Sequence, residues 1–143
     1  MKHVIPFALL AALAVSCDKE VDTGTLMTNP LDPDYIGIPL VEFAGDSSYK
    51  VFDNAVAVDT VYRLKYHIRT DLFPHATAYS VEARQVGGDG TVEQHGPLPF
   101  TADNVFTTEM HHVTYGNSYC VDAQVLVSGS GSKVFRVCGT AHE

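Results

Sequence analysis

The stretch that decides the fold is VTYGNSYCVDAQVLV, which covers residues 113–127. From residue 119 onward its side chains alternate between apolar and more polar types. The apolar set on one face consists of Tyr119, Val121, Ala123, Val125 and Val127. Strict alternation of this kind is typical of a strand with one buried face. The stretch therefore predicts a β-strand over residues 119–127 that contributes its odd-numbered side chains to a core.

Short runs of the same kind recur through the chain from about residue 40. Candidate strands cover residues 40–44, 54–59, 61–69, 78–86, 91–95, 105–111, 119–127 and 133–140. Turn-forming sequences lie between several of them, such as GGDG at 87–90 and SGSGS at 128–132. No long helical pattern is present beyond the N-terminal apolar run. About seven short strands at this spacing predict an all-β fold, a single antiparallel two-sheet β-sandwich over residues 40–143.

The residues that lead into the strand at 119–127 resemble the start of the sixth strand of fibronectin type III domains. In that family an apolar residue is followed by a glycine three positions later and by a tyrosine three positions further. Val113, Gly116 and Tyr119 occupy these positions. The resemblance implies an immunoglobulin-like sandwich in which Tyr119 is a corner tyrosine, with its hydroxyl bonded back to the backbone. The chain has no tryptophan for the family's core position, and Tyr66 or Ile68 is the expected substitute.

The N-terminus has the pattern of an export signal. Met1 and Lys2 are followed by an apolar run over residues 4–15, which closes as Ala14-Val15-Ser16-Cys17. A charged start, a short apolar centre and small residues before the cut are typical of a signal peptide, here residues 1–16. The run is shorter than the roughly 20 residues that cross a bilayer. A cysteine at the cut resembles the lipobox of bacterial lipoproteins, which implies cleavage before Cys17 and its acylation, for example with palmitate.

Residues 17–39 are acidic and contain three prolines, Pro30, Pro33 and Pro39. Such a composition buries little apolar surface, so we expect a flexible tether that does not pack on the sandwich. The acidic residues behind Cys17 resemble the surface-export signal of Bacteroidota lipoproteins, which implies an outer-membrane protein on the cell surface. In enterobacteria an aspartate at this place resembles an inner-membrane retention signal, so a periplasm-facing location stays open.

The remaining cysteines, Cys120 and Cys138, are expected to form one disulfide, because exported proteins seldom keep free thiols. If residues 128–132 form a hairpin turn, the last two strands are antiparallel neighbours. Pairing the cysteines then leaves both on the outward face and apolar residues opposite each other on the inward face. The predicted inward pairs are Val121 with Val137 and Ala123 with Phe135.

The chain is acidic, with 9 basic against 17 acidic residues and a formal net charge of −8. Loss of residues 1–16 would remove Lys2 and no acid, so the mature chain would be more acidic still. This charge argues against nucleic-acid binding and against electrostatic docking on anionic lipid. We therefore expect contact with the membrane to run through the N-terminal lipid.

One basic stripe stands out in this acidic chain. Arg63, Lys65, His67 and Arg69 fall on one face of the predicted strand at 61–69 and form a candidate binding face for a protein or an acidic glycan. Alternatively, the stripe pairs with acids such as Glu109 on the next strand. His67 could also face His111 and form a weak metal site, but we favour a solvated polar face and predict no metal or cofactor.

Nothing in the sequence identifies a reaction: there is no Gly-x-Ser-x-Gly elbow, and the cysteines are better explained by pairing. The sequence therefore predicts a non-enzymatic, lipid-anchored accessory or binding module of the cell envelope. A small hydrolase would need a pocket with converging histidine and carboxylate side chains and stays open as an enzymatic rival. Two non-enzymatic alternatives stay open as well. One is a glycan-binding lipoprotein of a polysaccharide-uptake system, which a row of exposed aromatic residues would favour. The other is a structural subunit of an envelope complex or surface appendage, which an uncovered edge strand or apolar patch would favour.

Overall fold

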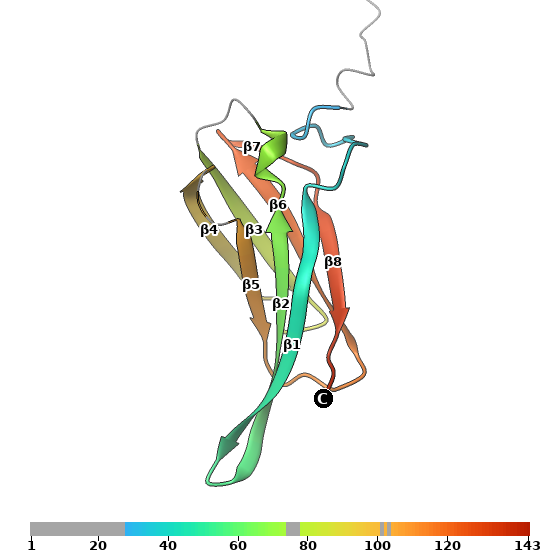
Figure 1. The fold of residues 1–143 in the computed structure, drawn as a ribbon, viewed down its shortest axis with the longest axis vertical. Helices are drawn as coiled ribbons and strands as arrows, with labels where there is room; N and C mark the ends of the chain where they lie inside the picture. The colour runs from blue at the N-terminus through green and yellow to red at the C-terminus, as the bar shows by residue number, and fades with distance from the viewer. Residues whose placement is uncertain (1–27, 74–77, 101, 103) are drawn as a thin grey trace, which may run out of the picture.

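A computed structural model describes residues 28–73, 78–100, 102 and 104–143, and these residues form a β-sandwich (Figure 1). Apart from the 3-10 turn η1 (Thr70–Leu72), the regular structure is made of strands. In chain order they are β1 (Val41–Asp53), β2 (Val56–Ile68), β3 (Ala78–Val86), β4 (Val92–Pro99), β5 (Val105–Met110), β6 (Ser118–Val127), β7 (Ser130–Gly131) and β8 (Phe135–Thr140). The prediction of an all-β fold is confirmed.

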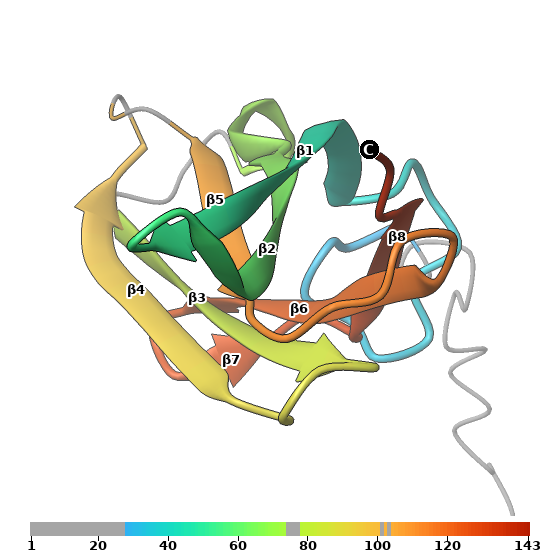
Figure 2. The same cartoon turned by 90° about the horizontal axis from the view of Figure 1, so that it is seen from below.

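The strands form two antiparallel sheets. One has the order β1-β2-β5, and the other has the order β4-β3-β6, with β7 and β8 both paired to the far edge of β6. Figure 2 looks along the strands and shows the two layers facing each other. The predicted two-sheet sandwich is therefore confirmed, with seven longer strands and the two-residue β7.

The core lies between the sheets and consists of the inward faces of β2, β3 and β6. The fully buried residues, each at most 1% exposed, include Tyr62, Leu64, Tyr66, Ile68, Tyr79, Val81, Ala83, Val121, Ala123 and Val125. Each large apolar side chain buried in this way stabilises the fold by about 1.5–3 kcal/mol. In the absence of tryptophan, large aromatic residues fill the centre: the ring of Tyr66 stacks on Phe106 with centroids 5.7 Å apart.

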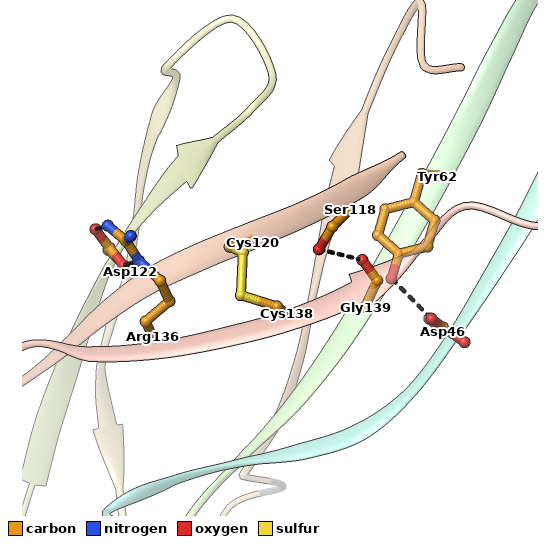
Figure 3. The surroundings of a disulfide bond; sticks show 8 residues. All are labelled: Asp46, Tyr62, Ser118, Cys120, Asp122, Arg136, Cys138 and Gly139. Atoms are coloured by element: carbon orange, nitrogen blue, oxygen red, sulfur yellow. Dashed lines mark hydrogen bonds and ion pairs between the residues drawn. A yellow bond between two sulfur atoms is a disulfide. The ribbon is translucent and has the colours of Figure 1, made fainter. Parts of the chain in front are cut away.

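The predicted disulfide and its register are confirmed. Cys120 and Cys138 are bonded, their Cα atoms are 4.0 Å apart, and they lie opposite each other on β6 and β8 (Figure 3). On the inward face Val121 pairs with Val137, and Ala123 pairs with Phe135, as expected from the alternation. The bond lies on the outward face and joins the last strand covalently to the centre of its sheet.

Close to the disulfide, β8 approaches the other sheet. The hydroxyl of Tyr62 donates a hydrogen bond of 2.7 Å to Asp46 on β1 (Figure 3). Burial, together with this hydrogen bond, raises the pKa of the Tyr62 hydroxyl well above its usual range. Gly139 of β8 faces the pair, and a Cβ atom at that position would collide with the hydroxyl. A glycine is therefore required where the two sheets come closest.

The first two strands differ from the prediction. The sequence suggested a short strand at 40–44 and two more at 54–59 and 61–69. Instead β1 is 13 residues long, and β2 joins most of the other two into one strand of 13 residues. A two-residue turn at Asn54 and Ala55, with φ values of 48° and 65°, joins β1 to β2. The polar run Gly45-Asp46-Ser47-Ser48 has a low intrinsic strand preference. It is extended because β1 pairs with β2 along nearly its whole length.

The expectation that residues up to Pro39 stay clear of the sandwich is wrong. Tyr35 is only 4% exposed and belongs to the core, Leu31 packs against the core, and the ammonium group of Lys133 donates a hydrogen bond to the carbonyl oxygen of Tyr35. The segment is acidic on average, so its composition did not indicate that a few apolar residues would anchor it to the sandwich. Cys17 and the rest of the predicted tether up to residue 27 lie outside the described residues.

Candidate functional site

The predicted corner tyrosine lies where β6 begins. Its hydroxyl accepts a hydrogen bond of 2.8 Å from the backbone N–H of Thr114, five residues upstream. Gly116, between them, has a φ of 86°, a conformation that favours glycine. Tyr119 is buried and its ring lies 5.7 Å from that of Tyr62. This geometry fixes the chain where it crosses into β6, so the role of Tyr119 is structural.

The basic stripe lies on the outer face of the β1-β2-β5 sheet, where acidic side chains from both neighbouring strands meet it. Arg63 forms an ion pair with Glu109 of β5, the partner suggested by the sequence. Its guanidinium also lies 4.7 Å from the ring centroid of Tyr49 on β1. Hydrogen bonding to Glu109 raises the pKa of Arg63. Lys65 lies on the same face and is exposed.

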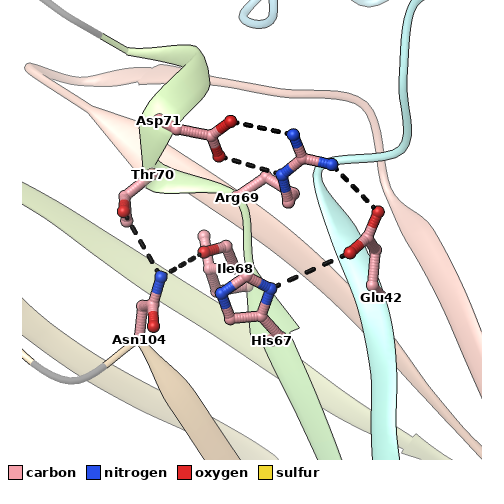
Figure 4. Close-up of polar contacts among 7 residues, drawn as sticks. All are labelled: Glu42, His67, Ile68, Arg69, Thr70, Asp71 and Asn104. Carbon is pink, nitrogen blue, oxygen red and sulfur yellow. Dashed lines mark hydrogen bonds and ion pairs between the residues drawn. The ribbon is translucent and has the colours of Figure 1, made fainter.

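At the other end of the stripe, the charges are paired in the same way (Figure 4). Arg69 binds Asp71 at 2.8 Å and Glu42 at 3.2 Å, and His67 lies 3.9 Å from Glu42. The Arg69 guanidinium lowers the pKa of Asp71. Three of the four stripe residues therefore have acidic neighbours, which leaves little free positive charge for an acidic ligand.

The suggested pairing of His67 with His111 does not occur, because His67 lies opposite Val105. His111 and its neighbour His112 instead both contact Asp59 of β2. The Nδ1 atoms of the two rings lie 2.7 and 3.1 Å from the carboxylate, and the backbone N–H of His112 donates to it at 2.7 Å. Hydrogen bonding to His111, with that backbone bond, lowers the pKa of Asp59.

Strand alternation would place the two histidines on opposite faces, which is why the sequence did not reveal this cluster. β5 ends at Met110, and His112 has a positive φ of 56° that turns its ring back toward Asp59. In the described part of the chain, no group of three or more His, Cys, Asp or Glu residues is arranged to hold a metal ion.

A second polar cluster lies between the sheets beside β4 and β5. The hydroxyl of Thr108, which is fully buried, donates a hydrogen bond of 3.1 Å to Glu93, and His95 lies 3.5 Å from the same carboxylate. Burial raises the pKa of the neighbouring Tyr66 hydroxyl to about 12. Thr108 and Tyr66 are fully buried, whereas the side chains of His95 and Glu93 are 29% and 28% exposed, so only the outer part of this cluster reaches the surface.

The most distinctive surface is the far part of the β1–β2 hairpin, residues 49–60, which we call the arm. Figure 1 shows the arm projecting beyond the other strands, at the end of the molecule opposite the N-terminal segment at 28–40. β5 pairs with β2 only from Tyr62 to His67, so the arm is a two-stranded ribbon. No single feature of the sequence predicts the arm, because the length of the arm depends on how far the neighbouring strands extend.

The arm carries exposed apolar side chains on both faces. The exposed fractions are 37% for Val51, 61% for Phe52, 65% for Val56 and 53% for Val58. Val56 lies opposite Asp53 on one face, and Phe52 lies opposite Ala57 on the other; Val58 is the extra residue of a bulge in β2, because Val51 pairs with Asp59 and Phe52 pairs with Ala57. A cluster of large exposed apolar residues on a protrusion is characteristic of a contact surface.

No helix among the described residues is long and apolar enough to cross a membrane. The chain matches no protein-family model, no curated protein and no solved structure. The arm carries four of the ten large apolar residues that are exposed in the described part of the chain, and we take it as the candidate functional site on these physical grounds.

Proposed function

We propose that this protein is a non-enzymatic binding module of the bacterial cell envelope, anchored by a lipid on Cys17, and that the arm contacts its partner. The observation that carries the proposal is the position of the arm. Its exposed apolar side chains lie at the end of the molecule away from the N-terminal segment, which joins the sandwich near the start of β1 (Figure 1). A lipid at the N-terminus would hold the end of the molecule that lies opposite the arm close to the membrane.

The length of the connecting chain supports this orientation. Ten residues, 18–27, separate Cys17 from the first described residue, and an extended chain of that length spans at most about 35 Å. Leu31 and Tyr35 are already packed against the core. The sandwich would therefore stand close to the lipid surface with the arm directed outward. The acidic residues behind Cys17 favour the outer face of an outer membrane.

The order of the strands supports an immunoglobulin-like scaffold of the fibronectin type III kind. The first, second and fifth strands share one sheet, while the third, fourth, sixth and last share the other. The hydrogen bond of Tyr119 agrees with the corner tyrosine of such domains. A scaffold of this kind does not specify a function, so the argument for binding rests on the arm.

A protein partner fits the arm better than a glycan. None of the seven tyrosines is strongly exposed, and Phe52 is the one strongly exposed aromatic residue of the arm, so the arm offers no row of aromatic rings for sugar stacking. An uncovered apolar ribbon instead favours the structural alternative, a subunit that docks on another protein of the envelope. The basic stripe, whose charges are mostly paired with acids, is a less favoured contact surface than the arm.

The anchor and the arm can be tested separately in cells. Cys17→Ser should release the protein from membranes and abolish labelling with radioactive palmitate. Replacement of residues 52–58 by Asn-Gly would close the hairpin early with a favourable two-residue turn and keep Asp59. This shortened protein should remain membrane-bound and acylated. A photo-crosslinking residue at Val58 should give adducts with protein, and the same residue at Val92, an exposed position on β4, should give none.

Unchanged membrane association of the Cys17→Ser protein would overturn the lipid anchor. An anchored protein that gives equal crosslinking at Val58 and Val92 would overturn the role of the arm and leave the anchor standing. The two parts of the proposal therefore fail independently.

A further inference from the structure

A second group of exposed apolar residues lies at the end of the molecule opposite the arm. Ile36, Ile38, Phe43 and Val134 are 68%, 52%, 52% and 55% exposed, and we call these four residues the rim. Three of them fall within residues 36–43, which lead into β1 and form its start. Figure 1 shows this part of the chain at the end that carries the N-terminal segment. The described chain therefore has an exposed apolar group at each end.

The backbone that carries the rim is pinned to the sandwich. Tyr35 is buried, and Gly37 lies so close to it that a Cβ atom at residue 37 would collide with the Tyr35 hydroxyl. The carbonyl oxygen of Leu40 accepts a hydrogen bond of 2.9 Å from the backbone N–H of Arg69. The ammonium group of Lys133 donates a hydrogen bond to the carbonyl oxygen of Tyr35, which places the loop before β8 beside the same segment. The rim is therefore a preformed surface.

The charged groups beside the rim are largely paired within the chain. Glu42 forms an ion pair of 3.2 Å with Arg69, which also binds Asp71 at 2.8 Å. The ammonium group of Lys133, besides its hydrogen bond to Tyr35, lies 5.2 Å from the ring centroid of Phe135. Unpaired charges carry the largest penalty when a surface leaves water. This end of the molecule can therefore approach an apolar phase at a modest cost.

The remaining charge near the rim selects the kind of surface. Asp32 and Asp34 lie on the same N-terminal segment, and the chain as a whole is acidic. Negative charge disfavours contact with anionic lipid. A zwitterionic headgroup such as phosphocholine or phosphoethanolamine carries no net charge and includes a cationic nitrogen, which suits an acidic border around apolar side chains.

We propose that the rim is a second membrane contact, which enters the zwitterionic headgroup region of the bilayer that holds the lipid on Cys17. The inference rests on the proposed lipid anchor. Membrane-surface proteins place aliphatic and aromatic side chains about 5–10 Å into this zone. Ten residues, at most about 35 Å of chain, separate Cys17 from Thr28, and Leu31 and Tyr35 are packed on the core. The rim is therefore within reach of the bilayer surface.

The contact is weak on its own and becomes effective through the anchor. Four partly exposed side chains offer a small apolar area. An anchored chain meets the surface at the high effective concentration that a short linker provides, so a weak contact is sufficient. The lipid then supplies attachment, and the rim supplies an orientation that directs the arm away from the membrane.

A fluorescence experiment with an artificial anchor tests the rim. The chain from residue 17, with Cys17→Ser and an N-terminal histidine tag, is bound to phosphatidylcholine vesicles that contain nickel-chelating lipid. An environment-sensitive label is attached through Ile38→Cys or, as the matched control on the arm, through Val58→Cys, because these positions are 52% and 53% exposed. Cys120 and Cys138 are bonded to each other and do not react with the label. The result does not depend on whether cells acylate Cys17.

Phosphatidylcholine brominated on its acyl chains quenches labels that enter the bilayer. The label at residue 38 should lose roughly half of its emission on brominated relative to ordinary vesicles, because interfacial side chains reach about 5–10 Å into the boundary. The label at residue 58 should keep its emission. Ile36→Asp places a charge in the rim and should restore the emission at residue 38 nearly in full. Val134→Asp, on the other side of the rim, should act in the same direction.

Val56→Asp is the matched control variant, because Val56 is 65% exposed and Ile36 is 68% exposed. It introduces the same charge on the arm and should leave the quenching at residue 38 unchanged. Circular dichroism should show that the charged variants keep the fold, because each substitution is at an exposed position.

Three outcomes would overturn the inference. The first is equal emission at residue 38 on brominated and ordinary vesicles, whether the rim stays in water or is covered by residues 18–27. The second is equal quenching at residues 38 and 58, which would show that the domain has no preferred orientation. The third is quenching at residue 38 that persists in both Ile36→Asp and Val134→Asp. Unchanged membrane association of Cys17→Ser in cells would instead overturn the lipid anchor and would leave the measured contact of the rim standing.

Discussion

Strand β6 and the arm have similar sequences and opposite surroundings. β6 presents Val121, Ala123 and Val125 to the core, and all three are 0% exposed. The arm offers valines at 56 and 58, which are 65% and 53% exposed. Both segments form strands because β-branched residues favour extended backbone. Only β6 has a sheet in front of it, so the same residue type provides core stability in one region and an exposed apolar surface in the other.

The two regions also differ in how they are held. β6 is paired on both sides, to β3 and to β8, and the disulfide fixes the second pairing. The arm is held by one pairing and, at its base, by the contacts of Asp59 with His111 and His112 and by the ion pair of Lys50 with Glu143. Substitutions in β6 should therefore change the stability of the whole domain, and those in the arm should change local order or association.

Removal of the disulfide should have the largest effect. The double variant Cys120→Ala, Cys138→Ala opens a cross-link between residues 18 positions apart, and closure of a loop of about this length is worth about 3 kcal/mol. We expect the free energy of unfolding, measured with urea, to fall by about that amount. Reduction of the natural protein should reproduce the loss. A change confined to the arm, with unaltered global stability, would contradict the comparison.

A matched pair of valine substitutions tests the comparison directly. Val125→Ala removes two methyl groups from the core and should lower the free energy of unfolding by about 2 kcal/mol, from lost burial and the cavity left behind. Val58→Ala removes the same groups from an exposed position and should change the free energy of unfolding by less than about 0.5 kcal/mol. Thermal or urea denaturation of dilute protein measures both. Equal losses would mean that the arm is buried in solution.

The smallest effect concerns the base of the arm and its dependence on pH. Since hydrogen bonding to His111 and His112 lowers the pKa of Asp59, its stabilising contribution is complete above the unfolded value near about 3.9 and is lost as the pH falls through the folded pKa. The NMR shift of the His112 amide should therefore titrate with a midpoint below that of an ordinary aspartate. Asp59→Asn should abolish the titration and leave urea stability nearly unchanged.

A midpoint at or above the ordinary value would show that the contact with the histidines does not hold in solution. His67 serves as the control, because its contact with Glu42 is long and lies at the other end of β2. Its amide should not follow the titration of Asp59.

The recurrence of about seven short strand patterns with turns between them predicted the sandwich. The alternation in residues 119–127 and 133–140, with one cysteine in each, predicted the pairing of β6 with β8 and the position of the disulfide. These features depend on contacts between segments close in sequence, where a period of two residues and a short turn leave one register that buries the apolar face. The acidic partner of Arg63 was predictable for a similar reason, because neighbouring strands present opposite charges to each other.

The arm, the burial of Tyr35 and the Asp59 cluster were decided by the tertiary structure. The arm exists because β5 stops pairing at Tyr62 while β1 and β2 continue, and no property of residues 49–60 sets that difference. Tyr35 is buried because it packs into the core of the sandwich, although the segment around it is acidic on average. Local pattern therefore indicated most of the strands, and the uneven reach of strands distant in sequence determined which apolar residues stayed exposed.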